Sequence, residues 1–227
     1  MSFDKLAPYY LRMEAVLAGG ILQRCRTAYL ADVSHCQSAL LLGEGPGRFL
    51  VELLRANPRV HVVCVEASAR MIHEARRTLR RNGMEDARVT FEQSDALSWQ
   101  PPRAVFDLVV THFFLDCFPH DALAALVAKV AASTQANARW LLADFQMPPR
   151  GWRRWRARVV LAVMYRFFRW TTGLSASALT SPDQFLMDAG FELRHRRSVN
   201  FGLAHSDLWH RTQSSLQDVP QAAPSGL

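Results

Sequence analysis

Short apolar runs alternate along this chain of 227 residues with segments in which apolar residues recur every three or four positions. The runs predict buried strands, and the periodic segments predict helices that pack on them. The predicted strands are residues 39–42, 60–65, 88–92, 107–111, 139–144, 191–198 and 208–211. The predicted helices are residues 12–30, 48–55, 69–81, 121–131 and 183–189. Apolar strands that alternate with helices indicate an α/β protein, with a mostly parallel sheet covered by helices on both faces.

Local signals support the helix boundaries. Ser68 is suited to cap the helix that ends at Asn82-Gly83, and Ser181-Pro182-Asp183 is typical of a helix start. The length fits a single domain over residues 1–212. The remaining residues, 213–227, are rich in Gln, Ser, Ala and Pro, and we expect them to be disordered.

The segment 41–49, LLGEGPGRF, places three glycines at alternate positions between a strand and a helix. Glycine is needed where φ is positive or where a ligand approaches bare backbone. About twenty residues later the next strand ends in Glu66, a distance that suits an acid binding ribose hydroxyls. Both features lie at carboxyl ends of parallel strands, where such sheets bind ligands. Together they predict a nucleoside-type cofactor.

A nicotinamide cofactor is the competing interpretation of this loop. Whether counting starts at Gly43 or at Gly45, the third glycine of a GxGxxG fingerprint is replaced, by Arg48 or Leu50. None of the four tyrosines is followed four residues later by lysine, so the short-chain dehydrogenase pair is absent. The sequence therefore disfavours a dehydrogenase.

Four segments together resemble the class I S-adenosylmethionine-dependent methyltransferases, most clearly over residues 39–145. They are LLGEGPGR, VCVEAS, SDAL and FDLVVTHFFLDCF. The resemblance implies a Rossmann-like doubly wound sheet with an antiparallel strand near the C-terminus, and S-adenosylmethionine as cofactor. It implies these cofactor-binding residues: Gly43, Glu44, Gly45, Gly47, Glu66, Ala67, Ser68, Met71, Asp95, Ala96, Thr111 and His112. In the family, Thr111 and His112 would close the pocket over the sulfonium.

The loop departs from the family at one position. The acid usually found two residues before the first glycine is replaced by Leu41, and Glu44 stands inside the loop instead. We expect Glu44 to face the cationic end of the cofactor; the alternative is a carboxylate that points into solvent.

His112 follows the fourth strand, where the methyl group is expected to emerge, and it is the candidate catalytic base. Asp116, four residues on, is the second catalytic candidate, expected to orient His112 or hold a substrate amine. A base is needed only if the acceptor must lose a proton. The alternatives stay open that His112 only lines the pocket and that Asp116 is a cap or faces solvent. Since His and Cys lack ligand spacing, we expect no metal site.

Two further regions are expected to contact the substrate. In the family, residues 1–36 correspond to an N-terminal helical lid, with Tyr9 and Tyr10 facing the substrate unless they pack on the sheet. Residues 146–180 correspond to a helical insertion on the substrate side, in which Trp152 and Trp155 join Phe113 as candidate substrate residues.

The insertion is distinctive because it contains no acid between Phe145 and Pro182. Its apolar residues share one helical face; Arg154, Arg158 and Arg169 lie roughly opposite, while Arg156 and Arg166 border the apolar face. The apolar residues are Trp152, Trp155, Val159, Val163, Phe167 and Trp170. A helix that caps an apolar pocket is the favoured interpretation, followed by peripheral membrane contact through residues 150–170. RNA binding comes last, since no RNA-binding module is appended, and we expect no nucleic-acid partner.

The net charge is +7, and all but two of the 27 basic residues are arginines. One explanation of this composition is codon bias, and the alternative is recognition of anionic groups by arginine. Because neither a signal peptide nor an apolar span is found, we expect a cytoplasmic protein, peripheral to the inner membrane face if the helix binds lipid. The predicted function is O-, N- or C-methylation of an apolar or aromatic small molecule. The alternatives are a membrane-surface lipid or quinone methyltransferase and a non-catalytic S-adenosylmethionine-binding protein.

Overall fold

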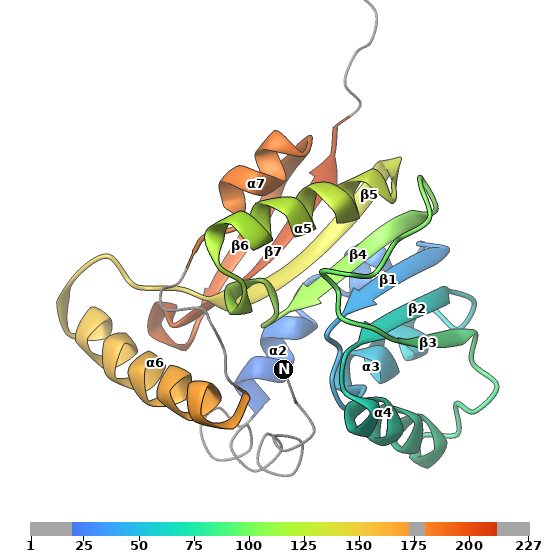
Figure 1. Cartoon of the computed structure of the whole chain (residues 1–227), viewed down its shortest axis with the longest axis horizontal. Helices are drawn as coiled ribbons and strands as arrows, with labels where there is room; N and C mark the ends of the chain where they lie inside the picture. The colour runs from blue at the N-terminus through green and yellow to red at the C-terminus, as the bar shows by residue number, and fades with distance from the viewer. Residues whose placement is uncertain (1–19, 173–179, 213–227) are drawn as a thin grey trace, which may run out of the picture.

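The computed structural model describes residues 20–172 and 180–212, which form a seven-stranded sheet in the order β3-β2-β1-β4-β5-β7-β6 (Figure 1). The strands are β1 (Ser38–Leu42), β2 (His61–Glu66), β3 (Val89–Gln93), β4 (Phe106–His112), β5 (Thr134–Phe145), β6 (Phe191–Val199) and β7 (Ala204–Arg211). The α-helices are α2 (Gly20–Arg26), α3 (Arg48–Ala56), α4 (Ala69–Arg81), α5 (His120–Ala132), α6 (Gly151–Thr172) and α7 (Asp183–Asp188). Short 3-10 helices are η2 (Ala31–Val33), η3 (Leu115–Cys117) and η4 (Asn200–Gly202).

The first five strands are parallel, and β7 runs antiparallel to both of its neighbours, β5 and β6. The chain moves outward from β1 to β3 and then returns to the other side of β1 with β4. This reversal between β1 and β4 is the topological switch point, where open α/β sheets bind ligands. The predicted Rossmann-like fold, with an antiparallel strand near the C-terminus, is confirmed.

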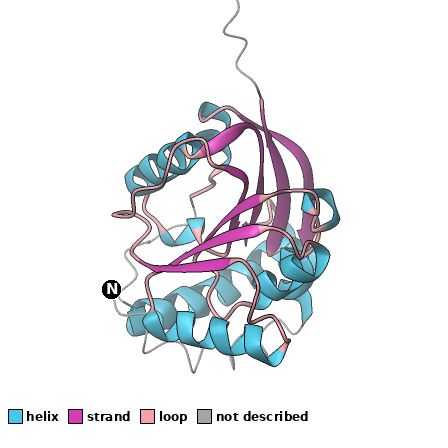
Figure 2. Cartoon of the chain, turned by 90° about the vertical axis from the view of Figure 1, so that its right-hand side faces the viewer, coloured by secondary structure: helices cyan, strands magenta, loops and turns pink. Residues whose placement is uncertain are grey.

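Side chains of the strands alternate between two apolar layers, as the pleat of a strand requires. In β1, Leu40 and Leu42 pack in the layer under α5 and α7, whereas Ala39 and Leu41 pack in the layer under α3. Helices therefore cover both faces of the sheet, as Figure 2 shows. Leu41, the residue that replaces the acid of related loops, is buried in the second layer.

Two strands are longer than their predicted ranges. β5 begins at Thr134 because this residue pairs with Phe106 of β4, and β7 begins at Ala204 because it pairs with Phe145 at the end of β5. The start of β7 reads AHSD, and its polar residues hide the strand from an apolar-run criterion. They are nevertheless buried.

The predicted helix 12–30 is described only from Gly20, where α2 begins and runs to Arg26. The earlier part of the expected lid, with Tyr9 and Tyr10, lies outside the described residues, as does the tail 213–227. The predicted helix in the insertion is present as α6, which lies beyond the end of β5 and apart from the helices that cover the sheet (Figure 1). Within the described part of the chain, no helix has the length and apolar character to cross a bilayer.

Candidate cofactor and acceptor site

The glycine loop joins β1 to α3 at the switch point. Its first residue, Gly43, donates a backbone hydrogen bond to the carbonyl of Val65 in β2 at 3.0 Å. The loop is thereby fixed between the carboxyl ends of two neighbouring strands. The N–H groups of the following helix then face the same edge, which is the arrangement that binds anionic and nucleotide ligands.

The three glycines serve different purposes, although all have positive φ, of 65°, 68° and 82°. A side chain at Gly43 would collide with the ring of Phe114, and one at Gly47 would press on the backbone of Ala75 in α4 at 3.1 Å. A side chain at Gly45 would meet no atom within 4 Å. Only Gly45 therefore leaves open space above the loop, as a cofactor lying against bare backbone requires. This open cradle fits the expected cofactor.

Glu66 connects the loop to the start of α4. Its carboxylate accepts backbone hydrogen bonds from Gly45 at 3.2 Å and from Ser68 at 3.0 Å. The backbone N–H of Ser94 donates to the Glu66 carbonyl at 3.2 Å, which brings the SDAL segment to the same place. Glu66 is half-buried at the carboxyl end of β2. Its carboxylate is positioned where the resemblance places the ribose hydroxyls, and that role stays a prediction.

The residues expected around the adenine differ in exposure. Ala67 and Asp95 are exposed, whereas Met71 and Ala96 are buried. Ser68 accepts the backbone N–H of Met71 at 3.2 Å and caps α4, as predicted. The Asp95 carboxylate accepts the backbone N–H of Leu97 at 2.9 Å, which shapes the turn after β3. These contacts explain the local folding of the segments, and their contact with adenine stays a prediction.

Glu44 turns toward the helix that follows the loop. Its Oε1 accepts the backbone N–H groups of Phe49 at 2.9 Å and Leu50 at 3.0 Å. Burial raises the pKa of Glu44 to about 7, against the opposing effects of the Leu50 hydrogen bond and the Arg26 charge. The carboxylate therefore caps α3, and the solvent-facing alternative is wrong. A role toward the cationic cofactor stays a prediction.

Thr111 does not present its side chain to the edge of the sheet. It is completely buried, and its hydroxyl accepts the indole N–H of Trp140 at 2.8 Å. Its neighbour His112 points to the opposite face, where its ring meets Phe49 edge-on at 4.6 Å between centroids. Because successive strand residues alternate, only one of the two side chains can face a given layer. The expectation that both side chains close the pocket is wrong for Thr111.

His112 is buried, and neither of its ring nitrogens has a hydrogen-bond partner among the described residues. Burial, and to a lesser extent the charge of Arg26, holds the pKa of His112 well below its usual range. Asp116 lies buried in η3 and accepts the thiol of Cys117 at 3.6 Å. The expected pairing of Asp116 with His112 is therefore absent, and His112 is a neutral ring with no group to orient it.

Aromatic rings gather after β4. Phe113 has a φ of 54°, unusual for a bulky residue, and its ring lies 4.8 Å from that of Phe145 at the end of β5. The Arg26 guanidinium stands over the Phe113 ring at 5.2 Å. Phe114 packs edge-on against Phe118 at 5.1 Å. Phe113 and Phe145 form an aromatic wall at the carboxyl ends of β4 and β5, whereas Phe114 and Phe118 pack in the layer under α5 and α7.

Trp152 and Trp155 are not part of that wall. Their exposed fractions are 60% and 71%, on the outer side of α6. Among the described side chains of α6, Ala157 and Leu161 are buried and pack on Leu203. The two tryptophans face away from this packed side, and their contact with a substrate stays a prediction.

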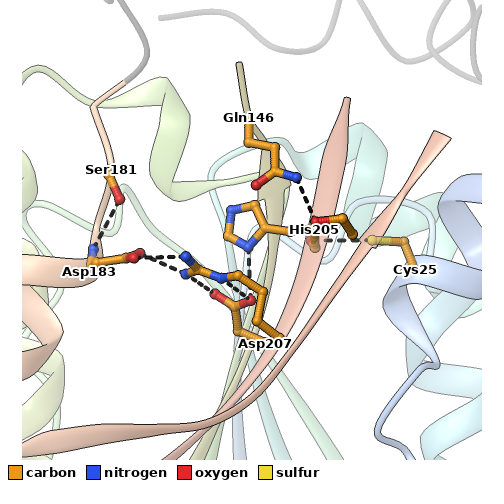
Figure 3. Close-up of polar contacts among 8 residues, drawn as sticks. Cys25, Gln146, Ser181, Asp183, His205 and Asp207 are labelled. Carbon is orange, nitrogen blue, oxygen red and sulfur yellow. Dashed lines mark hydrogen bonds and ion pairs between the residues drawn. The ribbon is translucent and has the colours of Figure 1, made fainter. Parts of the chain in front are cut away.

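A polar cluster with a buried centre lies at β5 and β7, and of its members the sequence analysis named only Asp116 as a functional candidate. The buried members are Asp116, Asp144, His205 and Asp207, and the partly exposed Arg196 and Asp183 join them through Asp207. Figure 3 shows the contacts around His205 and Asp207. The available signal was the spacing of His205 and Asp207, which places both on one face of a strand. Among the described residues, no group of His, Cys, Asp or Glu side chains is arranged to hold a metal ion.

Comparisons with known proteins agree with this geometry. Residues 39–137 match the family model described as a methyltransferase domain. The chain is 28% identical over 224 residues to demethylmenaquinone methyltransferase of Deinococcus radiodurans, covering 89% of this chain and 88% of the relative. The enzyme of the same name from Roseiflexus sp. is 32% identical over 115 residues, covering 50% of this chain and 46% of the relative.

Two solved structures share the fold. Mitomycin 7-O-methyltransferase superposes with a TM-score of 0.69 at 20% identity, over 93% of this chain and 61% of that one, so this chain spans about three fifths of its length. Magnesium protoporphyrin IX methyltransferase from Synechocystis, with bound SAH, superposes with a TM-score of 0.61 at 19% identity, over 84% of this chain and 82% of that one.

The fold and the glycine loop define a Rossmann-like domain for a nucleoside cofactor. Residues 39–137 match a methyltransferase domain, and the fold is that of solved methyltransferases; S-adenosylmethionine is the cofactor that this match implies.

Proposed function

We propose that this enzyme methylates an aromatic, apolar acceptor of the quinol or phenol type. The carrying observation is the aromatic wall at the carboxyl ends of β4 and β5. Phe113 is held at a φ of 54° with its ring 4.8 Å from that of Phe145. Bulky residues in the left-handed region are strained and gather at functional sites. The strain here presents an aromatic surface beside the methyl-transfer edge.

The acceptor class is also supported by the curated relatives. Both proteins carry the name demethylmenaquinone methyltransferase, and one of them is matched along 88% of its length. An apolar quinol ring stacks on phenylalanine rings at little desolvation cost. The rings of Phe113 and Phe145 suit such a flat acceptor better than a charged one.

The cofactor, when bound, supplies an activated methyl group on a sulfonium, and its sulfur keeps the bonding electrons when that group leaves. The chain's residues then have to hold the acceptor in line, exclude water and receive a proton if one is lost. Phe113 and Phe145 position the ring, while Gly45 and Glu66 fix the cofactor side. His112, buried and neutral, shapes the space between them.

The test is a methyl-transfer assay with purified protein and labelled S-adenosylmethionine. The acceptors are a reduced 1,4-naphthoquinol that lacks the ring methyl group, a simple phenol and an aliphatic amine. We expect labelled product from the naphthoquinol first, and a loss of about tenfold or more in Phe113→Ala. Met187→Ala, which removes an exposed side chain on α7, is the matched control. Labelling of the amine alone would contradict the proposal.

A membrane-surface location follows from a separate observation, the outer face of α6. Trp152, Trp155 and Val159 are exposed, and Phe201 extends the patch with its ring 5.5 Å from that of Trp152. Arg156 holds Phe201 in this position, because its guanidinium donates a hydrogen bond to the neighbouring residue, Asn200, at 2.9 Å. Together Trp152, Trp155, Val159 and Phe201 form the apolar α6 face.

The charges around the α6 face favour an anionic bilayer as its partner. Arg153, Arg154 and Arg158 are exposed on the same helix, Arg150 is exposed just before it, and the sequence has no acid between Phe145 and Pro182. Tryptophan sits readily at a membrane interface while arginine meets anionic headgroups. An apolar quinol acceptor dissolves in such a bilayer, so this location would bring the enzyme to its acceptor.

Vesicle co-sedimentation tests this location. We expect binding to vesicles that contain phosphatidylglycerol, weaker binding at high salt, and loss of binding in the Trp152→Ser/Trp155→Ser double variant. Met187→Ser again serves as the control for an exposed apolar residue. Absence of binding at low salt contradicts a membrane location, and binding to RNA in place of vesicles would reassign the α6 face.

A further inference from the structure

The amino end of β7 lies at the same edge of the sheet as the carboxyl ends of β4 and β5. In the strand register, His112 pairs with Ala143, and the next residue, Asp144, pairs with His205. Directly opposite residues of antiparallel strands point to the same face and approach each other within about 5.5 Å. Asp144 and His205 are therefore cross-strand neighbours at the edge where methyl transfer takes place.

His205 is oriented by a carboxylate. Its Nδ1 contacts Oδ1 of Asp207 at 2.9 Å, and both side chains are buried (Figure 3). Asp207 also accepts two hydrogen bonds from Arg196, at 2.8 and 2.6 Å. Arg196 is held in turn by both oxygens of Asp183, each at 2.9 Å. The chain of contacts fixes Asp207, and Asp207 fixes the imidazole ring.

This arrangement decides which nitrogen carries the proton. Burial would raise the pKa of Asp207, but hydrogen bonds from Arg196 and His205 outweigh it and lower that pKa. Asp207 is therefore a carboxylate, which only accepts, so Nδ1 of His205 must be the donor. The lone pair of neutral His205 is then on Nε2, which points away from Asp207 (Figure 3). No described residue forms a hydrogen bond with Nε2.

Asp144 differs from Asp207 both in its hydrogen bonds and in the direction of its pKa shift. Both of its carboxylate oxygens are buried and make no hydrogen bond of good geometry among the described residues, although the N–H groups of Phe114 and Asp116 are near. Burial, followed by the charge of Asp116, raises the pKa of Asp144 well above its usual range. A carboxyl group kept protonated in this way is a hydrogen-bond donor.

We propose that His205, oriented by Asp207, is the base that removes the acceptor's proton, and that Asp144 binds a second oxygen of the same acceptor. The acceptor class is an aromatic ring with a hydroxyl group and a further oxygen substituent. The inference rests on the proposed function, because it assumes a quinol- or phenol-type acceptor. Asp207 and Arg196 are positioning residues, since they act through His205.

The proton balance of this step is simple. The acceptor O–H bond breaks, its proton passes to Nε2 of His205, and the electron pair stays on the acceptor. The acceptor then forms one new bond to the methyl carbon as the carbon–sulfur bond breaks, and the sulfur leaves as a neutral thioether. His205 releases the proton to solvent. The net change is one methyl group gained and one proton released, with no oxidant or reductant consumed.

His205 is better suited to this role than His112. A base has to be oriented toward the group from which it removes the proton. His112 has no orienting partner among the described residues and its pKa is held well below the usual range. The charged and titratable groups around His205 are Asp207 of β7 itself, Asp144 of β5, Asp116 of η3, Arg196 of β6 and Cys25 of α2.

The test compares His205→Gln with His210→Gln, which removes a histidine at the other end of the same strand. With a phenolic acceptor we expect kcat to fall about 100- to 10,000-fold in His205→Gln and less than about threefold in His210→Gln. Acceptors with a more acidic hydroxyl group should reduce the loss. Equal losses of kcat in the two variants would overturn the proposal.

A second measurement does not depend on turnover. Nitrogen NMR of the imidazole rings, assigned with His205→Gln, should show the Nδ1–H form of His205 at neutral pH, and Asp207→Asn should change it. Binding of a phenol probe should weaken about tenfold in Asp144→Ala and less in Asp144→Asn. If wild type methylates no acceptor, the proposed function fails, and the NMR result still decides the His205 orientation. An Nε2–H form of His205 would overturn the dyad.

Discussion

The Oε1 atom of Glu44 accepts the backbone N–H of Leu50 at 3.0 Å, so a residue of the glycine loop caps the helix that the loop begins. The N-cap position itself is Gly47, whose missing side chain makes no cap hydrogen bond. Glu44 supplies the acceptor that a Ser or Asp would otherwise provide at a helix start. The cofactor loop and α3 are thereby held as one unit.

The first prediction concerns this cap. The pKa of Glu44 is raised from 4.5 to about 7, so its ionisation opposes folding. The associated stability is present below about pH 4.5 and is lost as the pH rises to about 7. Glu44→Gln keeps an acceptor without the charge and should gain stability relative to wild type between pH 5 and 7. Glu44→Ala lacks both the charge and the cap and should be less stable than Glu44→Gln by about 1 kcal/mol at all these pH values. Urea unfolding measures both.

The same group should couple cofactor binding to pH. A cationic sulfonium favours the ionised form of a nearby carboxyl group, so the affinity for S-adenosylmethionine should rise as the pH approaches about 7. The demethylated product is neutral at sulfur and should bind with less pH dependence. In Glu44→Gln both calorimetric profiles should be flat and the methyl donor should bind more weakly. Unchanged donor affinity would show that Glu44 only caps α3.

Substitutions of two loop glycines should affect protein stability and cofactor affinity to different extents. Alanine in the left-handed region costs about 1–2 kcal/mol, so both Gly45→Ala and Gly47→Ala lower the free energy of unfolding. Gly47→Ala should lower it further, since its methyl group would press on Ala75 at 3.1 Å. Gly45→Ala should cause the larger loss of cofactor affinity, because its methyl group enters open space above the loop. Chemical denaturation measures the free energy of unfolding of the two variants, and calorimetry measures their cofactor affinity.

Thr111 should affect stability alone. Thr111→Val leaves the buried indole N–H of Trp140 without its acceptor at 2.8 Å, which should cost about 1–3 kcal/mol of unfolding free energy. Thr111→Ser keeps the hydroxyl group and is the matched control. Cofactor affinity should stay within about twofold in both variants. A large loss of cofactor affinity in Thr111→Val would show that Thr111 contributes to the cofactor site.

Arg196 should stabilise the polar cluster through Asp207. Arg196→Met leaves the fully buried Asp207 carboxylate without its strongest partner and should cost about 3 kcal/mol. Because the pKa of Asp207 is lowered in the folded state, its contribution is present above about pH 4 and is lost as the pH falls further. The difference between Arg196→Met and wild type should therefore shrink in acid. Arg196→Lys, which keeps the charge without the planar fork, should fall between them.

The cofactor half of the fold was well predicted because its signals are local. The strand–glycine–helix pattern, the Ser68 cap and the acid at Glu66 each depend on a few neighbouring residues, and the structure places them at one edge. Apolar runs identified the central strands, since strands buried on both faces have little polar sequence. The search for apolar runs missed the start of β7, because its buried residues His205 and Asp207 are polar. Their burial is compensated by the contact between them and by Arg196 from β6.

The limits of sequence prediction on the acceptor side have a common physical cause. A period of three or four shows that Trp152 and Trp155 share a helix face, but not whether that face meets protein or solvent. α6 uses a different and smaller set, Ala157 and Leu161, to pack on Leu203. Likewise, adjacent strand positions such as Thr111 and His112 point to opposite layers, and only the layers themselves decide which one reaches the site.

The position of β7 between β5 and β6 has a consequence for synthesis on the ribosome. Because synthesis runs from the N-terminus, the glycine loop and Glu66 are made well before the strand that carries His205 and Asp207. Until that strand inserts, Asp144 lacks its cross-strand neighbour and β5 has an open edge. A nascent chain can thus assemble its nucleotide-binding half early, while the acceptor side is completed only when β7 takes its place between β5 and β6.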